Sequence, residues 1–162
     1  GAGTAAKELV EEVNGLDFVI TPVGGGGLLS GTAISVTELA PHAKVIAAEP
    51  EGADDAFRSM KENRIIPSIN PRTVCDGLLT SLSERTFAII KQRVDRIITV
   101  SDNAAIEAMR HIWERMKIIV EPSAAITFGL LIEGKIDMNG KRIGLILSGG
   151  NVDLERLPWK TN

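Results

Sequence analysis

VGGGGLLSG, from Val23 to Gly31, places four consecutive glycines directly before two leucines. The preceding run DFVITPV is apolar and β-branched, whereas the following run LLSGTAISVTELA has apolar residues at helical spacing. A solvent-exposed linker would not normally pass straight into such a helix. The pattern therefore predicts a buried strand that leads through a glycine loop into a helix.

Further apolar strands alternate with helical patterns along the rest of the chain. Strands are predicted at 18–23, 44–50, 96–101 and 142–150, and helices at about 53–63, 83–94, 102–116 and 122–131, in addition to one near the start and one after the glycine loop. Near-continuous apolar strands between helices predict an α/β fold with a mostly parallel, twisted sheet and helices on both faces. Residues 65–82 have no such pattern, and a loop of this length is usually functional or passes over a site.

Composition narrows the class of protein. The chain has 162 residues, 44% of them hydrophobic, which fits a single domain, 1–162, with an aliphatic core. A net charge of −3 without a Lys/Arg cluster gives no indication of nucleic-acid binding. No apolar stretch approaches the roughly 18 residues of a membrane span, so no membrane partner is expected. The single cysteine, Cys75, fits a reducing compartment, and we expect a cytoplasmic protein.

The glycine loop has the composition of a phosphate-binding site. At the carboxyl end of a parallel strand, glycines allow successive backbone N–H groups to converge on an anion, and the helix dipole favours the same charge. No Gly-Lys-Ser/Thr follows, and the dinucleotide spacing fails because Leu29 stands where its third glycine would be. A second glycine-rich strand end, Ser148 to Asn151, points to a shared small-ligand pocket. The alternative for both is a tight turn with close strand–helix packing.

Five motifs together resemble a known family. TPVGGGGLLSG, AAEPEGADDAF, DGLLTS, ERMKIIVEPSAA and LSGGNVDL occur in the order found in fold-type II pyridoxal-phosphate enzymes of the serine/threonine dehydratase family. AEPEGADD and ERMKIIVEP are most similar to the serine racemase-like branch, which includes hydroxyaspartate dehydratases. The resemblance covers essentially the whole chain and implies the large, cofactor-binding domain of such an enzyme.

The resemblance implies the cofactor pyridoxal 5′-phosphate and a set of residues that hold it. Its phosphate would be bound by the backbone N–H groups of Gly24, Gly25, Gly26, Gly27 and Leu28. Ser148 would hydrogen-bond the ring nitrogen, and Gly77 and Glu121 would line the ring. A hydroxyl does not hold the ring nitrogen protonated as a carboxylate does, which favours β-elimination and racemisation over transamination. The alternative for Glu121 is an acid at the start of a helix.

A second constellation, EPEGADD, suits a divalent cation. Glu49 and Asp55 could supply carboxylate oxygens with a backbone carbonyl between them, a ligand set that Mg²⁺ or Ca²⁺ accepts. The resemblance implies that the ligands are Glu49, the carbonyl of Ala53, and Asp55. The alternative is that Asp54 and Asp55 only begin a helix, where carboxylates suit the dipole.

The lysine that the family's chemistry requires has no match in this sequence. Lys61, in SMKENR, imitates the pattern but sits in a charged segment that we expect to be exposed. The chain opens without Met and passes almost directly into a helical pattern. We therefore expect the C-terminal part of the large domain, with the small domain and the lysine supplied by an N-terminal companion segment, and no catalytic activity from this chain alone.

The parent enzyme implied by the resemblance removes water from a small β-hydroxy amino acid, giving a 2-oxo acid and ammonia, or inverts its α-carbon. It would be a homodimer in its full-length form. Two other classes stay open at this point. One is a non-catalytic phosphate- or cofactor-binding module of the same fold, and the other is an unrelated α/β phosphate-binding protein that shares the loop by convergence.

Overall fold

The structure, a computed structural model, describes residues 1–159 and is built on one parallel sheet. Its four strands have the order β3–β2–β1–β4, and neighbours pair in parallel. The strands are β1 (Phe18–Pro22), β2 (Lys44–Pro50), β3 (Arg96–Val100) and β4 (Ile143–Leu145). In the register of the sheet, Ile20 lies beside Ile46 on one side and Leu145 on the other. The predicted parallel α/β architecture is confirmed.

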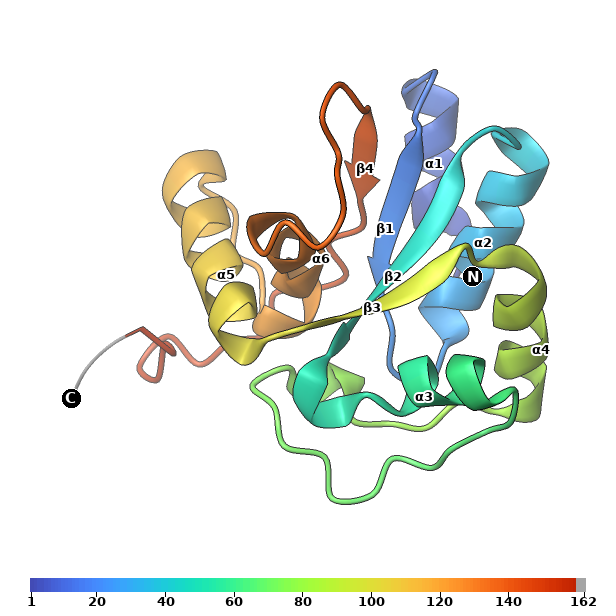
Figure 1. Cartoon of the computed structure of the whole chain (residues 1–162). Coiled ribbons are helices and arrows are strands. Elements are labelled where there is room, and N and C mark those ends of the chain that lie inside the picture. Colours follow the sequence, from blue (N-terminus) through green and yellow to red (C-terminus); the bar gives the residue numbers. More distant parts are fainter. Residues whose placement is uncertain (160–162) are drawn as a thin grey trace.

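Helices cover both faces of this sheet (Figure 1). The α-helices are α1 (Thr4–Glu12), α2 (Gly27–Leu39), α3 (Asp55–Glu62), α4 (Glu84–Arg93), α5 (Asp102–Met116) and α6 (Pro122–Ile132). Two short 3₁₀ helices are η1 (Glu51–Ala53) and η2 (Asp76–Leu78). Helices α1, α2 and α4 lie on one face, whereas α6 lies on the other with α5 packed against it (Figure 1).

Alternation along the strands builds a separate core on each face. Val19 is completely buried among residues of α1, α2 and α4. The next residue, Ile20, is completely buried against residues of α5 and α6. Successive strand side chains point to opposite faces, so a strand that is apolar throughout must be covered twice. This arrangement leaves the ends of the strands, rather than the faces, open to a ligand.

Capping residues in the sequence define where the helices near that edge begin. The Ser83 hydroxyl accepts from the Thr86 N–H while the Thr86 hydroxyl accepts from the Ser83 N–H, forming a capping box at α4. Ser101 caps α5 by accepting from the Ala104 N–H at 3.2 Å. Helix α6 begins with Pro122, whose missing N–H would have no helical acceptor at that position.

The last predicted strand is wrong in its length. We expected residues 142–150, but β4 ends at Leu145, and only one further ladder-like bond, from the Ile146 N–H to the Ile20 carbonyl at 2.9 Å, follows. Beyond it, the Gly149 carbonyl accepts from the Glu121 N–H at 3.1 Å. The chain therefore leaves the sheet because its polar groups bind the start of α6 instead.

The long segment from 65 to 82 is irregular, as expected, apart from the short helix η2. It runs along the edge where the parallel strands end (Figure 1). Within residues 1–159, no helix has the combination of length and apolar character that crossing a membrane requires.

Candidate functional site

The glycine loop joins β1 to α2 at the carboxyl edge of the sheet. Gly26 has a left-handed backbone, with φ of 82°, and directly precedes the first helical residue, Gly27. The first helical bond runs from the Ser30 N–H to the Gly26 carbonyl at 2.9 Å. The amides before Ser30 therefore have no intrahelical acceptor. The loop ends with the unsatisfied N–H groups that an anion requires.

The loop lies close against the segment around η2. A Cβ atom added to Gly24 would be 3.0 Å from the Cα of Leu78. One added to Gly25 would be 3.2 Å from the Thr80 hydroxyl oxygen. Side chains at these positions would push the two backbones apart. The absence of side chains thus keeps the loop amides beside the η2 segment.

A cavity of about 220 Å³ lies between these segments. It is lined by Pro22, Gly24, Gly25, Gly26, Gly27, Leu28, Leu29, Gly77, Leu78 and Ser148. Seven of the eight predicted cofactor residues are in this set, and they come from three distant parts of the sequence. None of the lining residues is a lysine. Lys61, as expected, is exposed, on α3.

Glu121, the eighth predicted residue, lies beside the cavity without lining it. Its Oε2 accepts from the Asn151 N–H at 2.9 Å, and its own N–H donates to the Gly149 carbonyl. A Cβ atom added to Gly77 would be 4.0 Å from Glu121 Oε1. Its side chain does not cap α6. Glu121 therefore holds the turn that follows Ser148 and reaches toward Gly77.

The predicted cation ligands are buried together after β2. Glu49 and Asp55 are each 1% exposed, and Ala53 is 4% exposed. Glu49 accepts from the Ala56 and Phe57 N–H groups at the start of α3, both at 2.7 Å. Despite these bonds, burial raises the pKa of Glu49 to about 8. The loss of hydration outweighs the two amide donors, and the nearby carboxylates of Asp55 and Asp54 raise the pKa of Glu49 further.

Asp55 has an unused oxygen. Its Oδ2 is buried without a hydrogen-bond partner among the described residues. Burial raises the pKa of Asp55, and the Ser68 hydroxyl, nearby but outside hydrogen-bonding geometry, offsets part of that rise. Across residues 1–159 no cluster of three or more His, Cys, Asp or Glu side chains could hold a metal ion. A cation here would thus rely on two carboxylates and a carbonyl.

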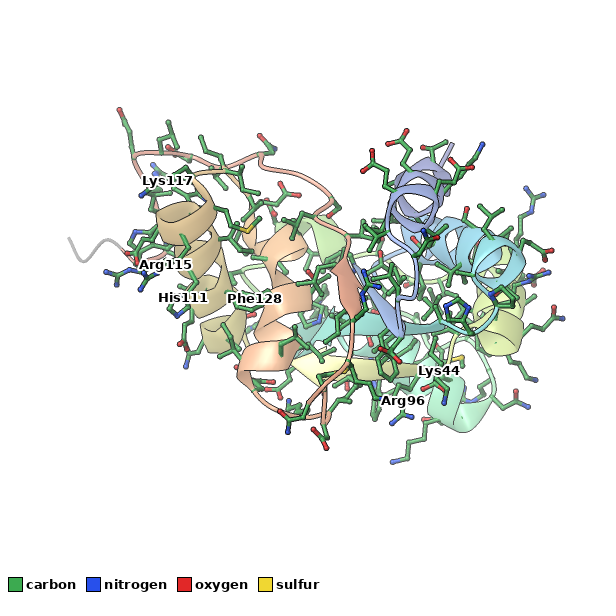
Figure 2. All side chains as sticks on the ribbon, turned by 90° about the horizontal axis from the view of Figure 1, so that it is seen from above. Lys44, Arg96, His111, Arg115, Lys117 and Phe128 are labelled. Atoms are coloured by element: carbon green, nitrogen blue, oxygen red, sulfur yellow. The ribbon has the colours of Figure 1, made fainter. Side chains whose placement is uncertain are left out.

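A larger hollow of about 480 Å³ lies on another side of the molecule. It is lined by His111, Ile112, Arg115, Met116, Phe128, Ile132, Leu145 and Leu147, which are mostly apolar. Figure 2 shows His111 and Arg115 on α5 and Phe128 on α6, across the view from Lys44 and Arg96. None of the predicted site residues lines this hollow, so the smaller glycine-lined cavity is the candidate site.

Several residues around the glycine-lined cavity were not predicted from the sequence. Leu78 lines it directly after Gly77, within the quoted motif DGLLTS. Asp102 holds the loop before Gly77 by accepting from the Thr73 hydroxyl and the Val74 N–H. The sequence pattern shows Asp102 only as an acid at the start of a helix. Its contact with Val74 could not be predicted, because the two residues lie 28 positions apart in the sequence.

The fold and the cavity agree with comparisons to known proteins. The family model for pyridoxal-phosphate dependent enzymes matches residues 1–149. The chain therefore belongs to the family of pyridoxal-phosphate dependent enzymes, and the resemblance carried by its motifs is confirmed.

Its relatives include a dehydratase and racemases. The β-hydroxyaspartate dehydratase of Paracoccus denitrificans (strain Pd 1222) is 50% identical over 159 residues, covering 98% of this chain and 50% of that protein. The serine racemase of Dictyostelium discoideum is 50% identical over 161 residues, covering 97% of this chain and 50% of that protein. The chain thus spans about half the length of these curated relatives.

Solved structures show the same fold. The crystal structure of the Dictyostelium discoideum serine racemase superposes with a TM-score of 0.88 at 51% identity, covering 95% of this chain and 50% of that one. The structure of maize serine racemase has a TM-score of 0.88 at 39% identity, covering 95% of this chain and 48% of that one.

Proposed function

We propose that the full-length protein is a pyridoxal-phosphate enzyme that eliminates water from a small β-hydroxy amino acid or inverts its α-carbon. Elimination gives a 2-oxo acid and ammonia. The observation that carries the proposal is the single cavity that collects the glycine-loop amides, Gly77 and Ser148. The dehydratase and racemase relatives support the reaction class.

Each lining group has a distinct part in this proposal. The amides of Gly24–Leu28 bind the phosphate at the positive end of α2. The Ser148 hydroxyl hydrogen-bonds the ring nitrogen and, unlike a carboxylate, leaves it without a full positive charge. Gly77 lies along the ring, and Glu121 holds the turn after Ser148. When bound, pyridoxal phosphate supplies an electron sink for the substrate's α-carbon.

A lysine outside these 162 residues would complete the site. We propose that it moves the α-proton, and that residues 1–162 form the C-terminal part of the cofactor-binding large domain. The support is that the chain spans half of its relatives and that no lysine lines the cavity. We further propose a cytoplasmic homodimer, supported by the single, buried and reduced Cys75 for the compartment. Sedimentation of the full-length protein tests the dimer.

Equilibrium dialysis with pyridoxal 5′-phosphate tests the phosphate cradle. A Cβ atom at Gly27 would meet no atom within 4 Å, so a side chain fits there. Gly27→Asp should weaken binding by about tenfold or more relative to Gly27→Asn, because a carboxylate would repel the phosphate. Equal affinity of these two isosteric variants would contradict the proposed cradle.

Turnover by the full-length protein separates the enzyme from the non-catalytic module. The proposal expects ammonia and a 2-oxo acid from a β-hydroxy amino acid, or interconversion of its enantiomers. Tight cofactor binding without either reaction, across serine, threonine and hydroxyaspartate, would favour the binding module instead.

We also propose that Glu49, the Ala53 carbonyl and Asp55 bind Mg²⁺ or Ca²⁺. The support is the unpartnered Asp55 Oδ2 and the burial of two carboxyl groups close enough to repel each other. Mg²⁺ should raise the midpoint of thermal unfolding, and Asp55→Asn should remove that rise. Asp54→Asn is the matched control, because Asp54 is half-exposed and paired with Arg58 at 2.8 Å. A rise that survives Asp55→Asn would refute these ligands.

A further inference from the structure

A short segment, Arg72 to Leu78, connects the predicted cation ligands with the glycine-lined cavity. We propose that this segment couples the two sites energetically, and that Asp102 is the positioning residue that makes the coupling possible. The inference rests on the proposed cofactor and cation sites. Asp102 itself does not line the cavity and is not one of the three predicted cation ligands.

The segment begins in contact with the cation loop. The Arg72 N–H donates to the Gly52 carbonyl at 2.9 Å, and Gly52 lies in η1 directly before Ala53. A Cβ atom added to Gly52 would overlap the carbonyl oxygen of Arg72. The two backbones are therefore packed without space between them. A shift of η1 must be accompanied by a shift of Arg72.

Asp102 clamps the middle of the segment. Its Oδ1 accepts from the Thr73 hydroxyl, and its Oδ2 accepts from the Val74 N–H at 3.1 Å. The Thr73 hydroxyl oxygen in turn accepts from the Cys75 N–H at 3.1 Å. Cys75 is completely buried. Three consecutive residues are thereby attached to the first residue of α5 through one carboxyl group.

The segment ends as a wall of the cavity. The Gly77 N–H donates to the Ser123 hydroxyl at 3.0 Å, and the Leu78 N–H donates to the Cys75 carbonyl at 3.0 Å. The Cα of Leu78 lies 3.0 Å from the position of a Cβ atom on Gly24. The same few residues therefore contact the cation loop at one end and the phosphate-binding loop at the other.

A cation that draws in the Ala53 carbonyl would reposition η1 and, through Gly52 and Arg72, the wall formed by Gly77 and Leu78. Without the clamp at Asp102, the intervening residues would absorb this shift. Coupling between two binding sites is reciprocal and typically changes affinity about five- to 150-fold. We expect the cation to tighten cofactor binding by about fivefold or more.

The test is the dissociation constant of pyridoxal 5′-phosphate, measured by equilibrium dialysis on the full-length protein with and without saturating MgCl₂. The ratio of the two constants measures the coupling, because a general loss of stability would weaken both measurements alike. Asp102→Asn should reduce the ratio from about fivefold or more to less than about twofold.

Thr73→Val is a milder second variant, because it removes only the hydroxyl that links Asp102 to Cys75. It should reduce the ratio in the same direction, and it decides the question if Asp102→Asn does not fold. Asp137→Asn and Thr37→Val are the matched controls. Asp137 accepts from the Asn139 N–H in a distant exposed turn, and the Thr37 hydroxyl donates to the Ala33 carbonyl within α2. Both controls should keep the full ratio.

Two results would overturn the coupling and leave the proposed function standing. One is an unchanged ratio in both clamp variants. The other is an unaltered protein that binds the cofactor equally with and without Mg²⁺, although Mg²⁺ raises its midpoint of thermal unfolding. Failure to retain pyridoxal 5′-phosphate under either condition would instead remove the proposed function, and the coupling with it.

Discussion

Replacing Gly26 with alanine should destabilise the protein severely, although only one methyl group is added. The backbone at Gly26 is left-handed, with φ of 82°. The new Cβ atom would lie 2.8 Å from Leu82 Cδ2, 2.9 Å from Thr86 Cβ and 3.0 Å from Ile90 Cδ1. Ile90 is completely buried, so its side chain has no free space to move into.

The expected cost has two parts. Alanine in the left-handed region costs about 1–2 kcal/mol relative to the right-handed one. Forcing a methyl group into a packed core costs about 1–3 kcal/mol. The free energy of unfolding should therefore fall by about 2–5 kcal/mol, which lowers the midpoint of thermal unfolding by about 5–15 °C in a chain of this length.

Thermal and urea unfolding followed by circular dichroism measure this change. Gly27→Ala is the control one residue away, because its Cβ atom would meet nothing within 4 Å and its backbone is helical. That variant should match the unaltered protein or gain up to about 1 kcal/mol, since alanine favours the helix. If Gly26→Ala stays within about 0.5 kcal/mol of the unaltered protein, or if Gly27→Ala loses as much as Gly26→Ala, the geometry inferred for the loop is wrong.

Three further results are expected. Burial raises the pKa of the Cys75 thiol to about 12, so at pH 8 only about one thiol in ten thousand is ionised. Iodoacetamide should therefore modify the protein only after unfolding. Rapid labelling of the native protein, seen by mass spectrometry, would contradict this. Ser83→Ala removes the capping box of α4 and should lower the free energy of unfolding by about 1 kcal/mol. Ser83→Asp should keep most of that stability, because a carboxylate can also accept from the helix N–H groups. An equal loss of stability in the two variants would argue against a capping role. Leu29→Ala removes a completely buried side chain next to the cavity, and urea titration should show a free energy of unfolding lower by about 3–5 kcal/mol. A loss below about 1 kcal/mol would mean that the surrounding residues close the space left by the deletion.

Periodicity in the sequence was sufficient for most of the fold. The strand at 44–50 and the helix at 102–116 have the predicted bounds, because their apolar patterns and end signals act within a few neighbouring residues. The last strand is shorter than its apolar run because the backbone after Ile146 binds the start of α6. That competition depends on two segments meeting in space, and no local pattern encodes it.

The candidate site was likewise only partly predictable from the sequence. The glycine loop was recognisable because four residues without side chains before a helix have a direct physical consequence for backbone amides. Gly77 carries no such signal by itself, and it joins the site only because Ser123 and the glycine loop hold it there. The clamp by Asp102 was not predicted, since its partners, Thr73 and Val74, lie in a segment without periodicity.

By itself, the sequence determined the alternation of strands and helices, the position of the glycine loop between a strand and a helix, and the family to which the chain belongs. These properties arise from local backbone preferences and from side-chain periodicity. Only the tertiary structure decided that Ser148 and Gly77 share one cavity with that loop, and that Asp55 retains an unpartnered oxygen beside the buried Glu49. Parallel strands end at a common edge, so residues more than a hundred positions apart become neighbours only when the sheet has formed.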